Sequence, residues 1–228
     1  MPIQHPSPNC GARRDGVRPD MVVLHYTAMD GWEKARDWLC NTDAQVSAHY
    51  LITPQGDVVQ MVDEAARAWH AGAGRWGDIC DVNSHSIGIE ISNTGATPFA
   101  AAQMDALDAL LADILRRWDI PAARVIGHSD MAPGRKIDPG VRFDWQRLAR
   151  RGLAVWPNAG DPVPPDATRF RADAARAGYT ADVDGATLLT CVRLRFRPWA
   201  RGPLDGTDMA VIADIAHRFP VDAKLASA

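Results

Sequence analysis

Two histidines and one aspartate stand at places in the chain where together they can hold a metal ion. His25 ends a short apolar run at residues 21–25, whereas His128 and Asp138 lie on a Gly- and Pro-rich loop that follows another such run. Open α/β sheets bind ligands at the carboxyl ends of their strands, and we expect all three residues there. Two imidazoles and one carboxylate are a competent ligand set for zinc, with a fourth position left for water. The spacing alone is not specific, because a histidine at a strand end is more often structural.

The hydrophobic pattern predicts the elements that position these residues. Strands are expected in five short apolar runs, at residues 21–25, 50–52, 58–62, 86–91 and 124–127. The second and third of these flank the turn at residues 54–57 and form a β-hairpin. Helices are expected at residues 32–39, 98–118 and 144–151, the second with Thr97 as its N-cap and Pro98 at its first position. Residues 128–141 are expected to form a loop.

The composition changes after residue 157, where four prolines occur within residues 156–165. Such a segment favours an extended linker, which we place at residues 158–165. The remaining 63 residues, 166–228, have the pattern of three helices, at residues 167–177, 186–195 and 207–218. The chain therefore divides into a first domain at residues 1–157, the linker, and a small all-α domain.

Five motifs around these elements occur in an order that resembles one family. They are LHYT at residues 24–27, VSAHYLI at 46–52, AWHAG at 68–72, SIGIE at 86–90 and GHSDMAPGRKIDPG at 127–140. Together they resemble the zinc-dependent N-acetylmuramoyl-L-alanine amidases of the peptidoglycan-recognition-protein superfamily, most closely the bacterial amidases of the AmpD and AmiD type. The resemblance spans about residues 22–157. It implies an α/β fold with a mixed central sheet flanked by helices. The helical remainder resembles, more weakly, the three-helix peptidoglycan-binding domain often joined to these amidases.

The resemblance also implies roles for individual residues. His25, His128 and Asp138 match the zinc ligands, Glu90 matches the general base, and Lys136 matches the cation that stabilises the developing oxyanion. The implied reaction is hydrolysis of the amide between N-acetylmuramic acid, including its 1,6-anhydro form, and L-alanine of peptidoglycan stem peptides. These residue types suit that chemistry, because zinc lowers the pKa of bound water to about 7 and a nearby carboxylate can accept its proton.

Simpler explanations remain open for several of these residues. A carboxylate at Glu90, between two isoleucines of a strand, is also typical of a solvent-facing position, and Lys136 alone would be a solvated loop charge. His70 either lines the substrate cleft or packs against its neighbours. Asn93, just past the strand of Glu90, is a candidate hydrogen-bond donor to substrate. At the level of the whole protein, the alternatives are a muropeptide-recognition protein without activity and a protein in which the metal is structural.

The overall composition sets limits on partners and location. With 25 basic and 28 acidic residues the formal net charge is −3, so the basic surface that nucleic acids require is not expected. No run of 18 apolar residues occurs, so we expect no membrane span. The four cysteines form no C-x-x-C pair and are expected to be free thiols. We expect a monomer that acts on muropeptides or the sacculus. The polar N-terminal segment favours the cytoplasm, and the periplasm is the alternative if a signal or lipoprotein anchor was trimmed.

Overall fold

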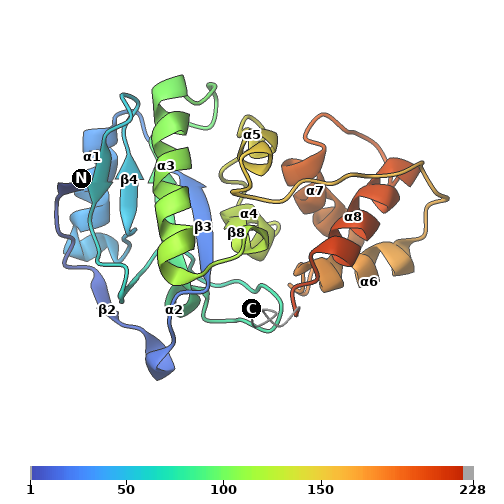
Figure 1. Ribbon diagram of the computed structural model, residues 1–228, viewed down its shortest axis with the longest axis horizontal. Coiled ribbons are helices and arrows are strands. Elements are labelled where there is room, and N and C mark those ends of the chain that lie inside the picture. Colours follow the sequence, from blue (N-terminus) through green and yellow to red (C-terminus); the bar gives the residue numbers. More distant parts are fainter. Residues whose placement is uncertain (1, 223–228) are drawn as a thin grey trace.

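The computed structural model describes residues 2–222, and within them a six-stranded mixed sheet forms the centre of the molecule (Figure 1). The strand order is β1-β5-β4-β7-β3-β8. Only β4 and β5 pair antiparallel, as the predicted hairpin, and the other neighbours are parallel. Their bounds are β1 Ile3–Gln4, β3 Met21–Tyr26, β4 Tyr50–Ile52, β5 Val58–Gln60, β7 Ser86–Ile91 and β8 Val125–Gly127. A separate antiparallel ribbon joins β2 (Cys10–Ala12) to β6 (Ala66–Ala68). The predicted α/β fold with a mixed central sheet is confirmed.

Helix α3, Ala101–Trp118, covers one face of this sheet (Figure 1). Its buried stripe packs on alternate side chains of the strands, including Leu24 and Ile89. Each fully buried aliphatic side chain stabilises the fold by about 1.5–3 kcal/mol. The expected start of this helix is wrong: its N-cap is Ala100, not Thr97. The carbonyls of Thr97 and Pro98 instead accept hydrogen bonds from a side chain of the preceding loop.

The C-terminal helices α6 (Ala167–Ala177), α7 (Gly185–Phe196) and α8 (Gly206–Arg218) pack against the opposite side of the sheet. Their apolar side chains form one continuous buried cluster with strand residues that point to that side, namely Met21, Val23 and Ile126. In Figure 1 the helices lie beside β8, at the end of the molecule away from the N-terminus. The division into domains at residues 157 and 165 stays a prediction. The packing, however, makes the helices part of the same core.

The remaining helices are short. They are α1 (Trp32–Cys40), α2 (Val82–His85), α4 (His128–Met131) and α5 (Trp145–Arg150). The expected loop at residues 128–141 is wrong at its start, because the first four of these residues form the helical turn α4 directly after β8. Within residues 2–222, 3-10 turns lie at Arg14–Gly16, Thr42–Ala44 and Ala122–Arg124.

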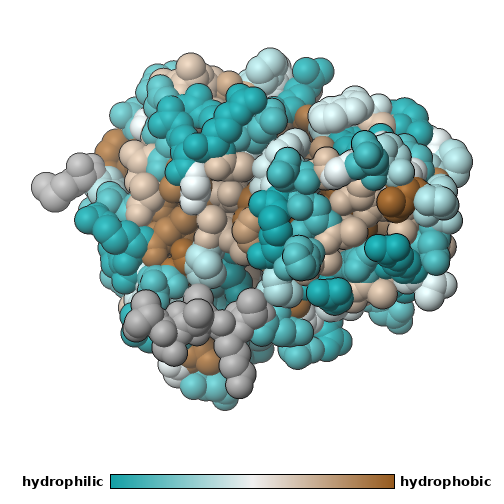
Figure 2. Space-filling model, turned by 45° about the vertical axis from the view of Figure 1, so that its right-hand side comes forward, coloured by the Kyte–Doolittle hydropathy of each residue, from teal (hydrophilic) through white to brown (hydrophobic). Residues whose placement is uncertain are grey.

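The surface is mainly hydrophilic on the face that Figure 2 shows, with apolar side chains exposed in smaller areas between. Among the described residues, no helix is long and apolar enough to cross a bilayer. The four cysteines are free thiols.

Candidate active site

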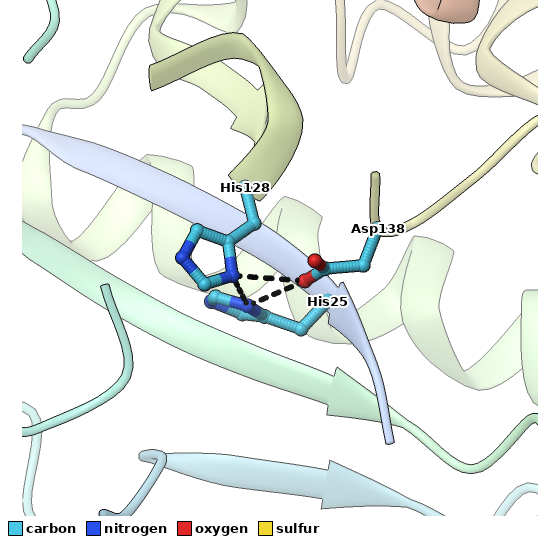
Figure 3. Close-up of side chains that lie close together, drawn as sticks. All are labelled: His25, His128 and Asp138. Atoms are coloured by element: carbon cyan, nitrogen blue, oxygen red, sulfur yellow. Dashed lines mark hydrogen bonds and ion pairs between the residues drawn. The ribbon is translucent and has the colours of Figure 1, made fainter. Parts of the chain in front are cut away.

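The three candidate metal ligands converge on one point (Figure 3). The Nδ1 atoms of His25 and His128 lie 2.9 Å and 3.0 Å from the same carboxylate oxygen of Asp138, and 3.0 Å from each other. Ligand atoms around a tetrahedral zinc ion lie roughly 3.3–3.6 Å apart, so only a small outward movement is needed to admit one. All three residues are buried. The structure thus brings together the three residues that the sequence singled out.

The sheet explains why they meet. His25 lies near the end of β3, and His128 begins the helical turn that follows the neighbouring parallel strand β8. Parallel neighbours place their carboxyl ends at the same edge of a sheet. Asp138 returns to this edge because the backbone N–H of Ser129 donates a hydrogen bond to its carbonyl, at 2.9 Å.

Hydrogen bonds on the far side of the ring fix His128 in one tautomer. Its Nε2 lies 2.9 Å from the carbonyl oxygen of Ala71, which can only accept. This contact is shorter than the 3.4 Å approach of the Arg135 guanidinium to the same nitrogen, so the ring carries its proton on Nε2 and the lone pair of Nδ1 faces the other ligands.

A chain of side chains does the same for His25. The Ser86 hydroxyl donates to the carbonyl of Val82, so its oxygen accepts from Nε2 of His70 at 3.2 Å. The Nδ1 of His70 is then an acceptor, and it accepts a hydrogen bond from the Nε2–H of His25 at 3.0 Å. The lone pair of His25 Nδ1 is left facing the site. Such outer partners orient metal-ligating histidines and fix their tautomers.

The ionisation states also suit a cation. Burial, with the neighbouring imidazole of His128, lowers the pKa of His25 to about 4, so that this ring is neutral. Burial raises the pKa of the Asp138 carboxyl, but the close ring nitrogens of His128 and His25 outweigh this effect and hold the pKa below its usual range. A neutral imidazole and an ionised carboxylate are the forms that bind metal ions.

Glu90 lies directly beside the ligands. It is the register partner of His25 in the β3–β7 pair, so the two side chains project from the same face of the sheet. Among the described residues, its buried Oε2 has no hydrogen-bond partner. Burial and the charge of Asp138 raise the pKa of Glu90 to about 8, and the charge of Lys136 opposes them. A partnerless carboxylate oxygen beside three converging ligand atoms is arranged to exchange a proton with a molecule in the cleft.

Comparison with known proteins decides the family. The sequence pattern described as N-acetylmuramoyl-L-alanine amidase matches residues 15–141. The chain belongs to this amidase family. It is 32% identical to the N-acetylmuramoyl-L-alanine amidase AmiD of Escherichia coli, over 90% of this chain and 85% of the relative. It is 35% identical to the 1,6-anhydro-N-acetylmuramyl-L-alanine amidase AmpD of Enterobacter cloacae, over 63% of this chain and 86% of that protein.

Solved structures of relatives agree with this amidase over nearly its whole length. E. coli AmiD, in complex with the substrate anhydro-N-acetylmuramic acid-L-Ala-D-gamma-Glu-L-Lys, matches 90% of this chain and 92% of its own with a TM-score of 0.80. AmpDh3 of Pseudomonas aeruginosa, in complex with an anhydromuramic pentapeptide, matches 91% and 94% with a TM-score of 0.80 and 32% identity. The predicted family and the predicted enzyme class are confirmed.

The site of this amidase opens into a cleft of about 500 Å³. The cleft is lined by the three candidate ligands, Glu90 and Lys136, together with apolar side chains that include Trp38 and Ile137. A cleft of this size holds a small organic ligand.

Of the two expected substrate-binding residues, only His70 lies in the cleft wall. Both of its ring nitrogens are already engaged, by His25 and by Ser86. Its ring lies so close to Gly88 that a Cβ there would be 2.4 Å from it. His70 therefore orients the candidate ligand His25, a role that was not predicted from the sequence. The alternation Ser86, Gly88, Glu90 along one strand face was a usable signal for it.

Asn93 is not among the residues that line the cleft. Its amide nitrogen donates to the carbonyls of Thr97 and Pro98, and its side-chain oxygen accepts from the backbone of Gly95. The side chain of Asn93 thus stabilises the loop that follows β7. The sequence Asn-Thr-Gly, typical of such a turn, was the signal that the substrate assignment overlooked.

Proposed function

We propose that this chain hydrolyses the amide between N-acetylmuramic acid and L-alanine of peptidoglycan stem peptides, with zinc held by His25, His128 and Asp138. The observation that carries the proposal is the convergence of these three ligand atoms beside Glu90, whose Oε2 has no hydrogen-bond partner in the part of the chain that the structure describes. Relatives that match 90% and 91% of this chain were solved with anhydromuramyl peptides bound, which supports the 1,6-anhydro form as a substrate.

Each residue then has a defined task. When bound, zinc supplies a Lewis acid that polarises the amide carbonyl and lowers the pKa of water. In its ionised form, Glu90 accepts a proton from water in the cleft and returns it to the leaving nitrogen of L-alanine, and its raised pKa makes it a stronger base. Lys136 lines the same cleft and donates a charge-assisted hydrogen bond to the oxygen on which negative charge develops. Each of these residues comes from one chain, so the expected monomer is sufficient.

Replacement of Glu90 by glutamine tests the assignment of the base. Glu90→Gln keeps the shape of the side chain but cannot accept the proton, so turnover should fall by about 10²–10⁴-fold. Zinc content, measured by elemental analysis, should be unchanged. Release of the stem peptide from an anhydro-muramyl tripeptide is the activity readout. Glu33→Gln is the matched control, because Glu33 is exposed on α1.

The outcomes separate the alternatives. Unchanged turnover in Glu90→Gln would overturn the assignment of the base. A zinc-loaded wild type that binds the muropeptide without releasing peptide would favour the recognition protein. Turnover on anhydro-muramyl peptide but not on intact sacculi would assign the chain to small recycling fragments, as expected for the cytoplasm. Release from sacculi would favour the periplasmic alternative.

A further inference from the structure

Residues of the C-terminal helical region make polar contacts with α4, the helical turn that begins with the candidate ligand His128. One oxygen of the Asp130 carboxylate accepts from the backbone N–H of Gly127 and from Nη1 of Arg195, both at 2.7 Å. The second nitrogen, Nη2, of Arg195 donates to the carbonyl of Val125 at 3.0 Å. A single guanidinium on α7 therefore bridges the strand before His128 and the turn that contains it.

Two further contacts act on the same turn. The hydroxyl of Tyr179, just after α6, donates to the second oxygen of Asp130 at 3.0 Å. The thiol of Cys191 donates to the carbonyl of Ser129 at 3.1 Å. Cys191 and Arg195 are four residues apart, so they project from the same side of α7. Ser129 in turn holds the segment of the third candidate ligand through its backbone N–H.

These contacts are not needed to dock the helices. The helices already share a continuous apolar cluster with the sheet. The side chains of Arg195 and Asp130 are only 3% and 1% exposed, and a buried ion pair is often no more stabilising than apolar residues of similar volume. What the pair adds is direction, because a guanidinium presents its donors in a fixed plane. Its two partners lie on either side of His128.

We propose that Arg195 is a positioning residue for the candidate zinc site. From α7 it fixes the corner between β8 and α4, and so directs Nδ1 of His128 toward the other two ligand atoms. The inference rests on the proposed function, because it assigns a task toward the proposed zinc ion. A functional site needs its groups held to within about 0.5 Å, so a small rotation of this corner weakens zinc binding. The C-terminal helices are thereby part of the metal site without contributing a ligand.

A neighbouring arginine provides the matched control. Arg193 lies on the same helix and pairs with buried Asp208, and it also donates to the carbonyls of Gly202 and Pro203. All of these partners belong to the C-terminal region. Arg193→Met therefore removes a comparable ion pair without touching the turn of His128, whereas Arg195→Met removes the contact to Asp130.

The test compares zinc binding in these variants at a temperature where circular dichroism shows them folded. The affinity for Zn²⁺ is measured by competition with a chromophoric chelator, and the geometry by the visible spectrum of the Co²⁺-loaded protein. Arg195→Met should weaken Zn²⁺ binding by about 10–100-fold and alter the Co²⁺ spectrum. Arg193→Met should change Zn²⁺ affinity by no more than about twofold. Arg195→Lys keeps the charge but loses the fixed fork, and should fall between wild type and Arg195→Met.

Each possible result supports or overturns the positioning role of Arg195. Equal losses of Zn²⁺ affinity in Arg193→Met and Arg195→Met would show a general effect of destabilisation and overturn the inference. Wild-type affinity in Arg195→Met would also overturn it, as would wild-type affinity in Arg195→Lys if the methionine variant does not fold. A wild-type protein that binds no Zn²⁺ would overturn the proposed function itself, and this inference with it.

Discussion

Replacement of His70 by phenylalanine should weaken zinc binding although His70 is not a candidate ligand. The substitution keeps an aromatic ring against Gly88 but removes both nitrogens. One of these nitrogens accepts from His25 at 3.0 Å, and the other contacts Ser86 at 3.2 Å. Without them the Nε2–H of His25 is buried with no acceptor, and nothing holds the orientation of its ring.

The magnitude follows from these two lost contacts. A buried polar group left without its partner costs about 1–3 kcal/mol, which is roughly 5–150-fold in a dissociation constant if the cost falls on the metal-bound state. Loss of an outer partner of a metal-ligating histidine weakens binding by about 10–100-fold. We therefore expect the Kd for Zn²⁺ to rise 10–100-fold in His70→Phe. His70→Asn, whose side-chain oxygen can replace Nδ1 as an acceptor, should recover part of this loss.

The assay is chelator competition for Zn²⁺, followed by kcat on an anhydro-muramyl peptide at saturating zinc. His217→Phe is the control, because His217 is exposed on α8. Zinc affinity in His70→Phe equal to that of wild type would refute the reasoning, since it would show that the Ser86–His70 chain does not orient His25. A loss of the same size in His217→Phe would also refute it.

Two further predictions concern the oxyanion and acid stability. Lys136→Met should lower kcat by about 10²–10³-fold, because the charge that stabilises the developing oxyanion is lost, while Zn²⁺ affinity changes little. Steady-state kinetics measures kcat and chelator competition measures the Zn²⁺ affinity. An unchanged kcat would remove Lys136 from the mechanism. Burial lowers the pKa of His49 to about 3, from an ordinary value near 6.5, so between these pH values the unfolded chain binds a proton that the native chain does not. Protonation of His49 in the unfolded chain should thus cost no stability well above pH 6.5 and about 2 kcal/mol at pH 5. Urea unfolding measures this cost as the extra fall in stability of wild type over His49→Gln between these pH values. An equal fall in both proteins would contradict the assignment.

Much of the sheet was predictable because period-two alternation and short apolar runs are local signals. The same alternation correctly placed Glu90 opposite its flanking isoleucines. The helix starts at α3 and α4 were less predictable. Thr97 and Pro98 carry the usual N-terminal signal, but contacts from a neighbouring loop take up their carbonyls. The turn at His128 is helical because Asp130 accepts from the backbone N–H of Gly127, which a loop-like composition does not reveal.

The contacts of the candidate site were harder to predict than its members. His70 and His25 are 45 residues apart, and Asp130 and Arg195 are 65 apart, so no sequence spacing indicates that they meet. The Pro-rich segment favours a separate C-terminal domain, yet the run Met21 to Leu24 is apolar on both faces. A strand that is apolar on both faces is covered on both sides. That run was a local sign that a second layer had to cover the sheet.

The site thus has two supports, and a double variant tests whether they are separate. His70 acts on His25 from the β6–β7 side, whereas Arg195 acts on His128 from α7. The two supports share no hydrogen-bond partner, so their effects on the free energy of zinc binding should add within about 0.5 kcal/mol. The measurement is a double-mutant cycle of Zn²⁺ affinity over wild type, His70→Phe, Arg195→Met and the combination. A coupling well above that value would mean that loss of either support collapses the whole site, and the picture of independently held ligands would be wrong. Additive losses would show that each histidine is oriented by its own layer of the fold.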